Sequence, residues 1–167
     1  LSPADPSHCG ALLESLDSMA VPVKLGRNSI YVFGSRSRLG PTDLTALPYP
    51  GFPTDLQAAM CVLMTQAEGI SIITERVYPH RFAHLGELER MGAAIALEGQ
   101  SAIVKGPRKL TGARTVAADL RGGACLYLAA LAAEGESTIQ NVHHVDRGYE
   151  GFEEKLRSLG AVIERIS

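Results

Sequence analysis

Three stretches of the chain repeat one pattern of apolar and polar positions. Each opens with leucines three residues apart, which predicts a short helix, and continues with alternating apolar and polar residues, which predicts a strand. The stretches cover residues 12–34, 85–106 and 152–167, and in the first two a turn and a second strand follow. The pattern therefore indicates an internal repeat built from helices and strands.

A second repeated piece precedes two of these stretches. It reads TDLQAAMCVLMTQAEGISIITE over residues 54–75 and ADLRGGACLYLAALAAEGESTIQ over residues 118–140. In both copies Asp-Leu begins a predicted helix, a cysteine follows six residues after the aspartate, and Glu-Gly ends the helix before a strand. Further strands are predicted in LTALP and ARTVAA, so the full unit is βαβαββ.

This repeat divides the chain into three parts of a single lobe. We interpret residues 1–40 as a partial repeat, 41–110 as a complete repeat and 111–167 as a repeat that lacks its last strand. We therefore expect a segment of a longer protein whose second lobe is absent. The alternative is a complete domain with degenerate first and last units.

The predicted fold class is α/β, with repeated βαβαββ units, helices packed inside and four-stranded mixed sheets outside. The helix between Asp119 and Glu134 is apolar nearly all round, which is typical of a helix at the centre of such an arrangement. Gly92 and Gly160 fall where a helix ends in a left-handed residue. The two units should therefore end their second helices in the same way.

Composition and charge exclude several classes of function. Of the 167 residues, 46% are apolar and 20% are charged, and the formal net charge is −2 with scattered basic residues, so we expect no nucleic-acid partner. No apolar run approaches the roughly 20 residues that span a bilayer, and no charged-then-apolar leader opens the chain. We expect a cytoplasmic protein with a small-molecule partner and no membrane association.

The cysteines and histidines predict neither a disulfide nor a metal site. The chain has three widely spaced cysteines, and Cys61 and Cys125 lie in apolar helical stretches, which favours reduced core residues. His80 and His84 have helical spacing but no evident third ligand. The adjacent pair at 143–144 would point to opposite faces of a strand.

Charged residues gather where the predicted helices begin. Asp55 and Asp119 begin the first helix of two units, and Arg81 and Arg147 precede the second helix. These helix N-termini follow strands and should lie beyond the carboxyl ends of neighbouring strands, where α/β sheets usually bind ligands. All four side chains should therefore share one rim.

The aspartates have a simple structural explanation, whereas the arginines do not. Thr54 with Gln57 fits a capping box, and an aspartate in a first turn suits the helix dipole. Arginine is disfavoured there, yet Arg121 lies in a first turn beside two glycines, and Arg81 and Arg147 lie at similar places. Three guanidinium groups at one edge suit the capture of carboxylate or phosphate.

Four segments together carry a resemblance to a known family. They are FPTDLQAAM, ITERVYPHRFAHLGELERMGA, ADLRGGACLYLAALAAEG and HVDRGYEGFEEKLRSLGAVIERI. The chain resembles the UDP-N-acetylglucosamine 1-carboxyvinyltransferases over nearly its whole length, most specifically in DRGYE and FPTD and least over residues 1–45. The related shikimate-pathway enolpyruvyl transferases share the repeat architecture, but their motifs match these residues poorly.

The resemblance implies a reaction. In this family phosphoenolpyruvate is protonated at its methylene carbon, the 3′-hydroxyl of UDP-N-acetylglucosamine attacks C2, and phosphate leaves from a tetrahedral intermediate. This is the first committed step of peptidoglycan synthesis, and it requires no metal or redox cofactor. Such chemistry needs a carboxylate near the hydroxyl and cations around phosphoenolpyruvate.

The resemblance also assigns roles to residues. Asp55 would hold the 3′-hydroxyl and accept its proton, and Arg147 would grip phosphoenolpyruvate. Arg121 would face the reacting atoms and serve catalysis with these two. The substrate-binding residues implied by the family are Thr54, Asp55, Val77, Tyr78, Arg81, Asp119, Leu120, Arg121 and Arg147.

The family enzyme needs more than this chain contains. Its other lobe supplies a lysine and a mobile loop with a cysteine or aspartate that acts on phosphoenolpyruvate, and no cysteine here lies in a matching loop. We therefore expect the isolated segment to be inactive, because the reacting atoms are not held in place. The alternatives are a shikimate-type enolpyruvyl transferase and a non-catalytic repeat domain that binds anions.

Overall fold

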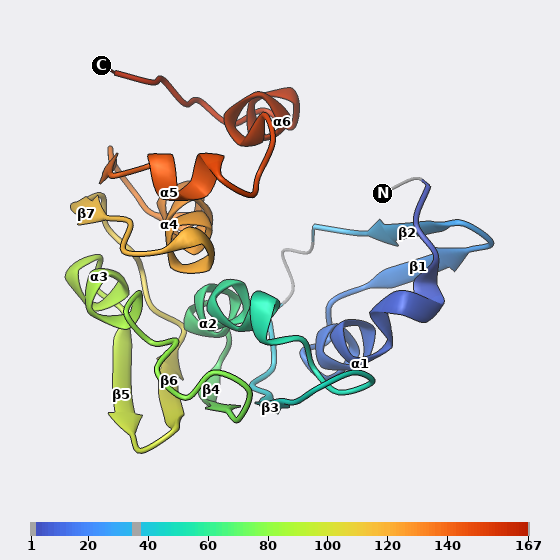
Figure 1. Cartoon of the computed structure of the whole chain (residues 1–167). Coiled ribbons are helices and arrows are strands. Elements are labelled where there is room, and N and C mark those ends of the chain that lie inside the picture. Colours follow the sequence, from blue (N-terminus) through green and yellow to red (C-terminus); the bar gives the residue numbers. More distant parts are fainter. Residues whose placement is uncertain (1–2, 35–37, 167) are drawn as a thin grey trace.

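The computed structural model describes residues 3–34 and 38–166 as an α/β fold, and residues 1–2, 35–37 and 167 lie outside the described part. Three groups of helices and strands follow one another along the chain (Figure 1). The first group is a helical segment followed by an antiparallel hairpin. Its elements are η1 (Pro6–Cys9), α1 (Gly10–Ser18), β1 (Val23–Gly26) and β2 (Ser29–Val32).

The middle group contains the predicted order of strands and helices. Its elements are β3 (Asp43–Ala46), η2 (Thr54–Leu56), α2 (Gln57–Thr65), β4 (Gly69–Glu75), α3 (Leu85–Arg90), β5 (Ala94–Glu98) and β6 (Ser101–Gly106). They form a four-stranded sheet in the order β3-β4-β6-β5. The pair β3–β4 is parallel, whereas β6 runs antiparallel to both of its neighbours. The predicted α/β class with a mixed sheet is confirmed.

One face of this sheet covers the helices and the other faces solvent. Because side chains alternate along a strand, Ile73 of β4 and Val104 of β6 are fully buried, while Ile70 and Leu97 are more than half exposed. The strand β6 contacts α2, which in turn packs against α4. The helices therefore lie inside and the sheet outside, as the pattern predicts (Figure 1).

The helix α4 lies at the centre of the fold. It runs from Leu120 to Ala132, and most of its residues from Gly122 to Ala129 are buried. Cys125, Leu126 and Ala129 join the main core with α2, β4 and β6, whereas Tyr127 joins a smaller cluster with Leu156 of the last helix. The prediction of a central apolar helix is confirmed.

The third group has two strands and ends without a third. Its elements are β7 (Arg114–Val116), α4 (Leu120–Ala132), β8 (Thr138–Gln140), α5 (His143–Asp146) and α6 (Phe152–Ser158), and β7 pairs with β8 in parallel. The strand predicted after Gly160 is wrong for the described residues 161–166. The segment after α6 corresponds to β5 of the middle group, which is hydrogen-bonded to β6. The described residues after α6 contain no strand that corresponds to β6. The outer two sheets therefore have two strands each, not four.

The segment after α6 is held apart from β8. Arg165 pairs with Asp146 of α5 and lies 3.7 Å from Glu153 of α6. A cavity of about 520 Å³ separates this segment from β8, and Tyr127 and Leu131 of α4 help to line it. In the middle group β6 fills the equivalent space between β4 and β5, over α2.

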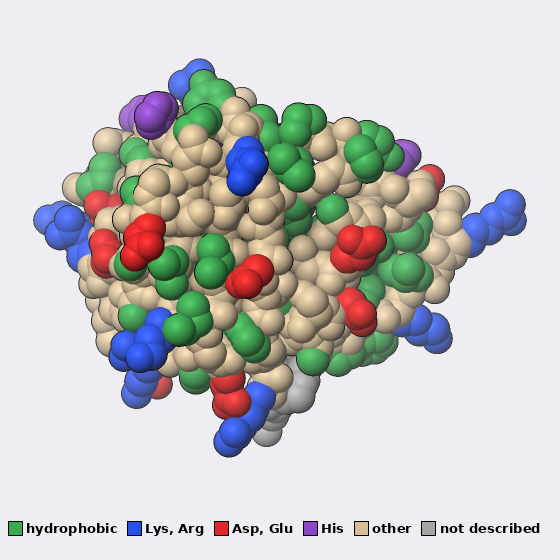
Figure 2. All heavy atoms as spheres, turned by 90° about the horizontal axis from the view of Figure 1, so that it is seen from below, with side chains coloured by type: hydrophobic (Ala, Val, Ile, Leu, Met, Phe, Trp, Pro, Cys, Tyr) green, Lys and Arg blue, Asp and Glu red, His purple; other side chains and the backbone are tan. Residues whose placement is uncertain are grey.

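Charges are mixed on the face that is seen from below the view of Figure 1. Figure 2 shows basic and acidic side chains interspersed with apolar ones on this face. Among the helices of the described residues, none is long and apolar enough to cross a bilayer.

Candidate functional site

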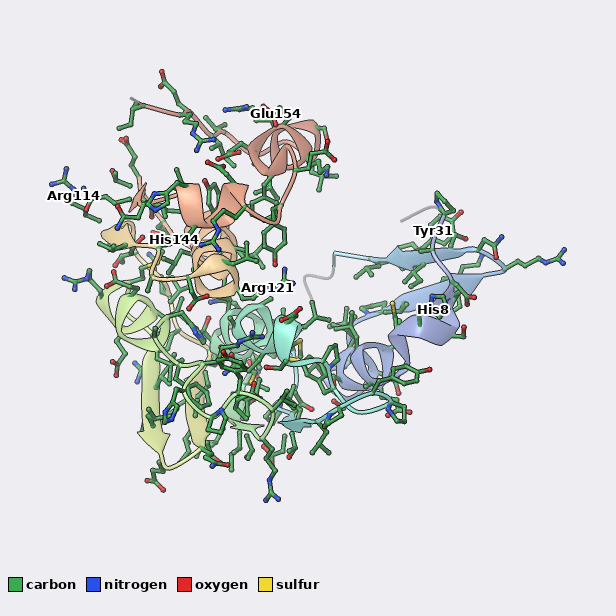
Figure 3. All side chains as sticks on the ribbon, in the orientation of Figure 1. His8, Tyr31, Arg114, Arg121, His144 and Glu154 are labelled. Atoms are coloured by element: carbon green, nitrogen blue, oxygen red, sulfur yellow. The ribbon has the colours of Figure 1, made fainter. Side chains whose placement is uncertain are left out.

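Three of the predicted rim residues meet in one cluster. Asp55 lies in η2 ahead of α2, Arg81 in the turn between β4 and α3, and Arg121 in the first turn of α4. The Asp55 Oδ1 atom lies 2.6 Å from Arg81 Nη1, and its Oδ2 atom lies 2.6 Å from Arg121 Nη2. Figure 3 shows Arg121 between α4 and the start of α2. One carboxylate therefore bridges two guanidinium groups.

The local sequence explains how α4 begins but not how α2 begins. The Asp119 side chain accepts a hydrogen bond of 2.7 Å from the Gly122 N–H, so Asp119 caps α4. The capping box predicted for Thr54 and Gln57 is wrong. The Thr54 hydroxyl instead donates to Glu75 at 2.7 Å, because a buried carboxylate on β4 lies within its reach.

The cluster favours the ionised form of its carboxylate. The hydrogen bond from Arg121 lowers the pKa of Asp55, partial burial opposes this, and the hydrogen bond from Arg81 adds to the lowering. The Asp55 side chain is 49% exposed, so solvent screens these effects. The pKa of Arg121 is raised, chiefly by its hydrogen bond to Asp55. Asp55 is therefore a carboxylate at neutral pH.

This pairing corrects one part of the electrostatic prediction. Asp55 already contacts both Arg81 and Arg121, so neither guanidinium group lacks a partner within the protein. Two guanidinium groups and one carboxylate leave one positive charge. Arg147 differs, since its side chain has no hydrogen bond or ion pair within residues 3–34 and 38–166.

The turn that carries Arg147 packs against the start of α4. The ring centroid of Tyr149 lies 5.2 Å from the guanidinium carbon of Arg121. A Cβ atom on Gly148 would lie 2.8 Å from a terminal methyl carbon of Leu120, so the turn lies against this side chain. The turn after α5 and the first turn of α4 therefore form one edge, and Arg147 is exposed on it.

The loop after β4 forms the other side of the cluster. Val77 and Tyr78 are 38% and 61% exposed, and their backbone N–H groups donate to Glu75 at 2.8 Å and 2.9 Å. The guanidinium carbon of Arg81 lies 5.1 Å from the Tyr78 ring centroid. Glu75 was not among the residues predicted for the site. Its position in β4 could have indicated it, because every second residue of this strand is buried and Glu75 follows Ser71 and Ile73 in that series.

The histidines occupy different environments. His84 is 3% exposed next to the start of α4, whereas His80 is exposed, so the pair does not face one space. The strand predicted for His143 and His144 is wrong: both lie in the short helix α5, with ring centroids 4.2 Å apart. No group of three potential metal ligands occurs in the described part of the chain.

Two cysteines fill the core, as predicted. Cys61 is fully buried and Cys125 is 1% exposed, and both are free thiols. Burial raises the pKa of Cys61 to about 12 and raises the pKa of Cys125 as well. Neither thiol reaches the arginine cluster as a reactive group, because the neutral form is favoured and the side chains are enclosed.

Comparisons with known proteins agree with this architecture. A UDP-N-acetylglucosamine 1-carboxyvinyltransferase from Koribacter versatilis is 52% identical over 97% of this chain and 37% of that protein. A second, named UDP-N-acetylglucosamine 1-carboxyvinyltransferase 2, from Bacillus subtilis, is 45% identical over 96% of this chain and 37% of that protein. The chain thus spans about 37% of the length of these curated relatives.

Solved structures show the same fold. The enolpyruvyl transferase NikO from Streptomyces tendae superposes with a TM-score of 0.87 at 36% identity, over 93% of this chain and 36% of that chain. An EPSP synthase from Acinetobacter baumannii gives a TM-score of 0.65 at 18% identity, over 93% of this chain and 36% of that chain, which is a likeness of fold alone. A family model described as EPSP synthase (3-phosphoshikimate 1-carboxyvinyltransferase) matches residues 3–156. The chain therefore belongs to this family of enolpyruvyl transferases.

Proposed function

We propose that this chain forms part of an enzyme that transfers the enolpyruvyl group of phosphoenolpyruvate to the 3′-hydroxyl of UDP-N-acetylglucosamine, in the first committed step of peptidoglycan synthesis. The observation that carries the proposal is the Asp55 carboxylate between Arg81 and Arg121, on one edge with the unpaired Arg147. The names of relatives that are 45–52% identical support it. The missing second lobe of the same polypeptide would supply the opposite wall.

Asp55 would act on the sugar hydroxyl. In the reaction the 3′-oxygen forms a bond to C2 of phosphoenolpyruvate, and the methylene carbon takes up a proton. The C2–O bond to phosphate then breaks, and the methyl carbon returns a proton. Asp55 is ionised beside its two arginines, so it can accept a hydrogen bond from the hydroxyl and then its proton. The acid that protonates the methylene carbon would lie outside this chain.

The arginines would hold the anionic substrate. Arg121 would face the reacting atoms and Arg147 would bind phosphoenolpyruvate on the same edge, whereas Arg81, paired with Asp55, belongs to the loop of the nucleotide sugar. Phosphoenolpyruvate carries a carboxylate and a phosphate, which bind well to planar guanidinium groups. As the C2–O bond breaks, charge moves onto phosphate, and fixed cations stabilise that charge.

Of the remaining predicted residues, those of the loop after β4 would line the pocket of the nucleotide sugar, and Asp119 and Leu120 would belong to the segment that faces the reacting atoms. Val77 and Tyr78 lie in the loop after β4, where the Tyr78 ring lies against Arg81, and Thr54 of η2 accepts a hydrogen bond from Arg81. Asp119 holds the first turn of α4, and Leu120 lies in that turn beside Arg121. The cytoplasm as the compartment, and the absence of a metal or redox cofactor, stay predictions.

A second acceptor is to be tested because the matching family model is described as a 3-phosphoshikimate enzyme. The experiment uses the complete product of the gene that encodes this chain, with phosphoenolpyruvate and either UDP-N-acetylglucosamine or shikimate 3-phosphate. Phosphate release and the mass of the product are measured. We expect an enolpyruvyl product only with the nucleotide sugar. A product with shikimate 3-phosphate would transfer the proposal to that acceptor, and no product with either would support an anion-binding domain.

Arg147→Lys tests the role of the unpaired arginine. Lysine keeps the charge but loses the planar fork, so we expect the KM for phosphoenolpyruvate to rise about tenfold, with unchanged thermal stability. The matched control is Arg114→Lys, because Arg114 is an exposed arginine of the same group that lies on the far side of α4 from Arg121 (Figure 3). Unchanged kinetics in Arg147→Lys would remove Arg147 from the site.

A further inference from the structure

Glu75 is a carboxylate enclosed by the core beside the arginine cluster. It is the last residue of β4, and none of its surface is exposed. Burial of a carboxylate is unfavourable unless hydrogen bonds replace its water. No cation pairs with Glu75 within the described residues, so its stabilisation comes from neutral donors.

Those donors come from two segments of the candidate site. The Oε1 atom of Glu75 accepts from the backbone N–H of Val77 at 2.8 Å and of Tyr78 at 2.9 Å. Its Oε2 atom accepts from the Thr54 hydroxyl at 2.7 Å. Glu75 therefore joins the loop after β4 to the η2 segment that carries Asp55.

The hydroxyl of Thr54 extends this connection to the cluster. Because Thr54 donates its hydrogen to Glu75, its oxygen is left as an acceptor, and Arg81 Nη1 donates to it at 3.2 Å. The same nitrogen donates to Asp55 Oδ1 at 2.6 Å. One nitrogen of Arg81 thus has two acceptors on the η2 segment, which restrain the orientation of the guanidinium group.

We propose that Glu75 is a positioning residue for the acceptor side of the site: through Thr54 it orients Arg81 against Asp55, and through two backbone N–H groups it fixes the loop of Val77 and Tyr78. The nature of the acceptor rests on the proposed function. Within the described residues Arg147 has no hydrogen bond or ion pair with this network, and its turn reaches the network only where the Tyr149 ring lies against Arg121. Glu75 therefore acts mainly on the acceptor side.

The substitution Glu75→Gln keeps the shape but changes the pattern of donors. If the new amide nitrogen faces Thr54, the hydroxyl must accept from it, and the bond from Arg81 is weakened. If the nitrogen faces the loop, two partly buried backbone N–H groups lose their acceptor. Thr54→Val tests the same connection from its other end and leaves the carboxylate in place.

Kinetics of the complete gene product provide the first measurement. We expect Glu75→Gln and Thr54→Val each to raise the KM for UDP-N-acetylglucosamine about tenfold, with the KM for phosphoenolpyruvate changed by less than about twofold. The matched control is Thr74→Val, because the neighbouring Thr74 hydroxyl bonds Ser101 at 2.8 Å on the other face of the sheet. The control should change neither constant.

Hydrogen exchange provides a measurement that does not depend on the acceptor. Glu75→Gln should accelerate exchange at the amides of Val77 and Tyr78 and leave that of α4 unchanged. If the wild-type protein transfers no enolpyruvyl group, the proposed function fails, and this exchange alone decides the role of Glu75. Equal rises of both KM values, or unchanged exchange in the loop, would overturn the proposal. If Glu75→Gln does not fold, Thr54→Val decides by the two KM values alone, because it leaves the acceptor of both loop amides in place: equal rises of both would overturn the proposal.

Discussion

His84 is a buried histidine whose two ring nitrogens have no hydrogen-bond partner within the described residues. It lies under the first turn of α4, where a Cβ atom on Gly122 would be 3.3 Å from the His84 Cβ atom. Burial lowers the pKa of His84 to about 4, against a smaller opposing effect of the nearby Asp119 carboxylate. The folded protein therefore keeps this ring neutral near pH 7.

This neutrality predicts a loss of stability in mild acid. Between pH 6.5 and about 4 the unfolded chain binds a proton at His84 that the folded chain does not. The free energy of unfolding should therefore fall as pH decreases through this window, by about 3 kcal/mol at its lower end. Urea unfolding of the chain at several pH values measures this change in the free energy of unfolding.

The matched variants are His84→Gln and His80→Gln, the second at an exposed position. His84→Gln should flatten the dependence on pH in this window, whatever it does to stability at pH 7. His80→Gln should keep the wild-type slope. An equal slope in wild type and His84→Gln would show that another group is responsible.

Single residues could be predicted from the sequence where their effect is local. Asp55, Arg81 and Arg121 were expected on one rim from their places before helices, and they meet there. The mutual pairing of these side chains was not expected, because it depends on rotamers across three elements. The role of Thr54 was missed for a similar reason, since its partner Glu75 is 21 residues away.

At the scale of elements, the helices α1, α3 and α6 end in the same hydrogen-bonded motif. After α3, Gly92 has φ +97° and the Ala93 N–H donates to Leu88 O at 3.0 Å. After α6, Gly160 has φ +98°, and the Ala161 N–H donates to Leu156 O at 3.1 Å, again five residues earlier in the chain. After α1 the equivalent left-handed residue is Ala20, with φ 59°. The first unit thus uses alanine where the other two use glycine.

This difference predicts opposite effects of two substitutions. Ala20→Gly should stabilise the chain by about 0.5–1 kcal/mol, because an L-residue is strained at positive φ. Gly160→Ala should destabilise it by about 1 kcal/mol, and the reason is conformational, since a Cβ there meets nothing within 4 Å. Denaturant midpoints measure both. Two changes of the same sign would contradict the shared motif.

Helix ends and the order of elements follow from local sequence, but strand pairing does not. Residues 161–166 alternate as a strand does, yet within the described residues they have no strand partner. His143 and His144 were placed on a strand because the pattern after β8 is too short to define its period. In both cases a strand was predicted from the local pattern, but a strand forms only beside a partner strand, and the local pattern gives no information about that partner.

At the scale of the whole molecule, the candidate site has one wall. Asp55, Arg121 and Arg147 lie on an edge where the carboxylate remains 49% exposed. The chain spans about 37% of its curated relatives, so most of an enzyme of their length lies elsewhere. Charges that stay in water attract an anion only weakly, because solvent screens them.

We therefore expect the 167-residue chain alone to release no phosphate from phosphoenolpyruvate and UDP-N-acetylglucosamine, while the complete gene product does. Without an opposite wall the hydroxyl and C2 are not held together, and effective concentration is lost. Phosphate release is measured for both proteins at equal concentration. Circular dichroism and a cooperative thermal transition confirm that the shorter chain is folded. Turnover by that chain at the rate of the complete product would mean that this edge is sufficient for catalysis.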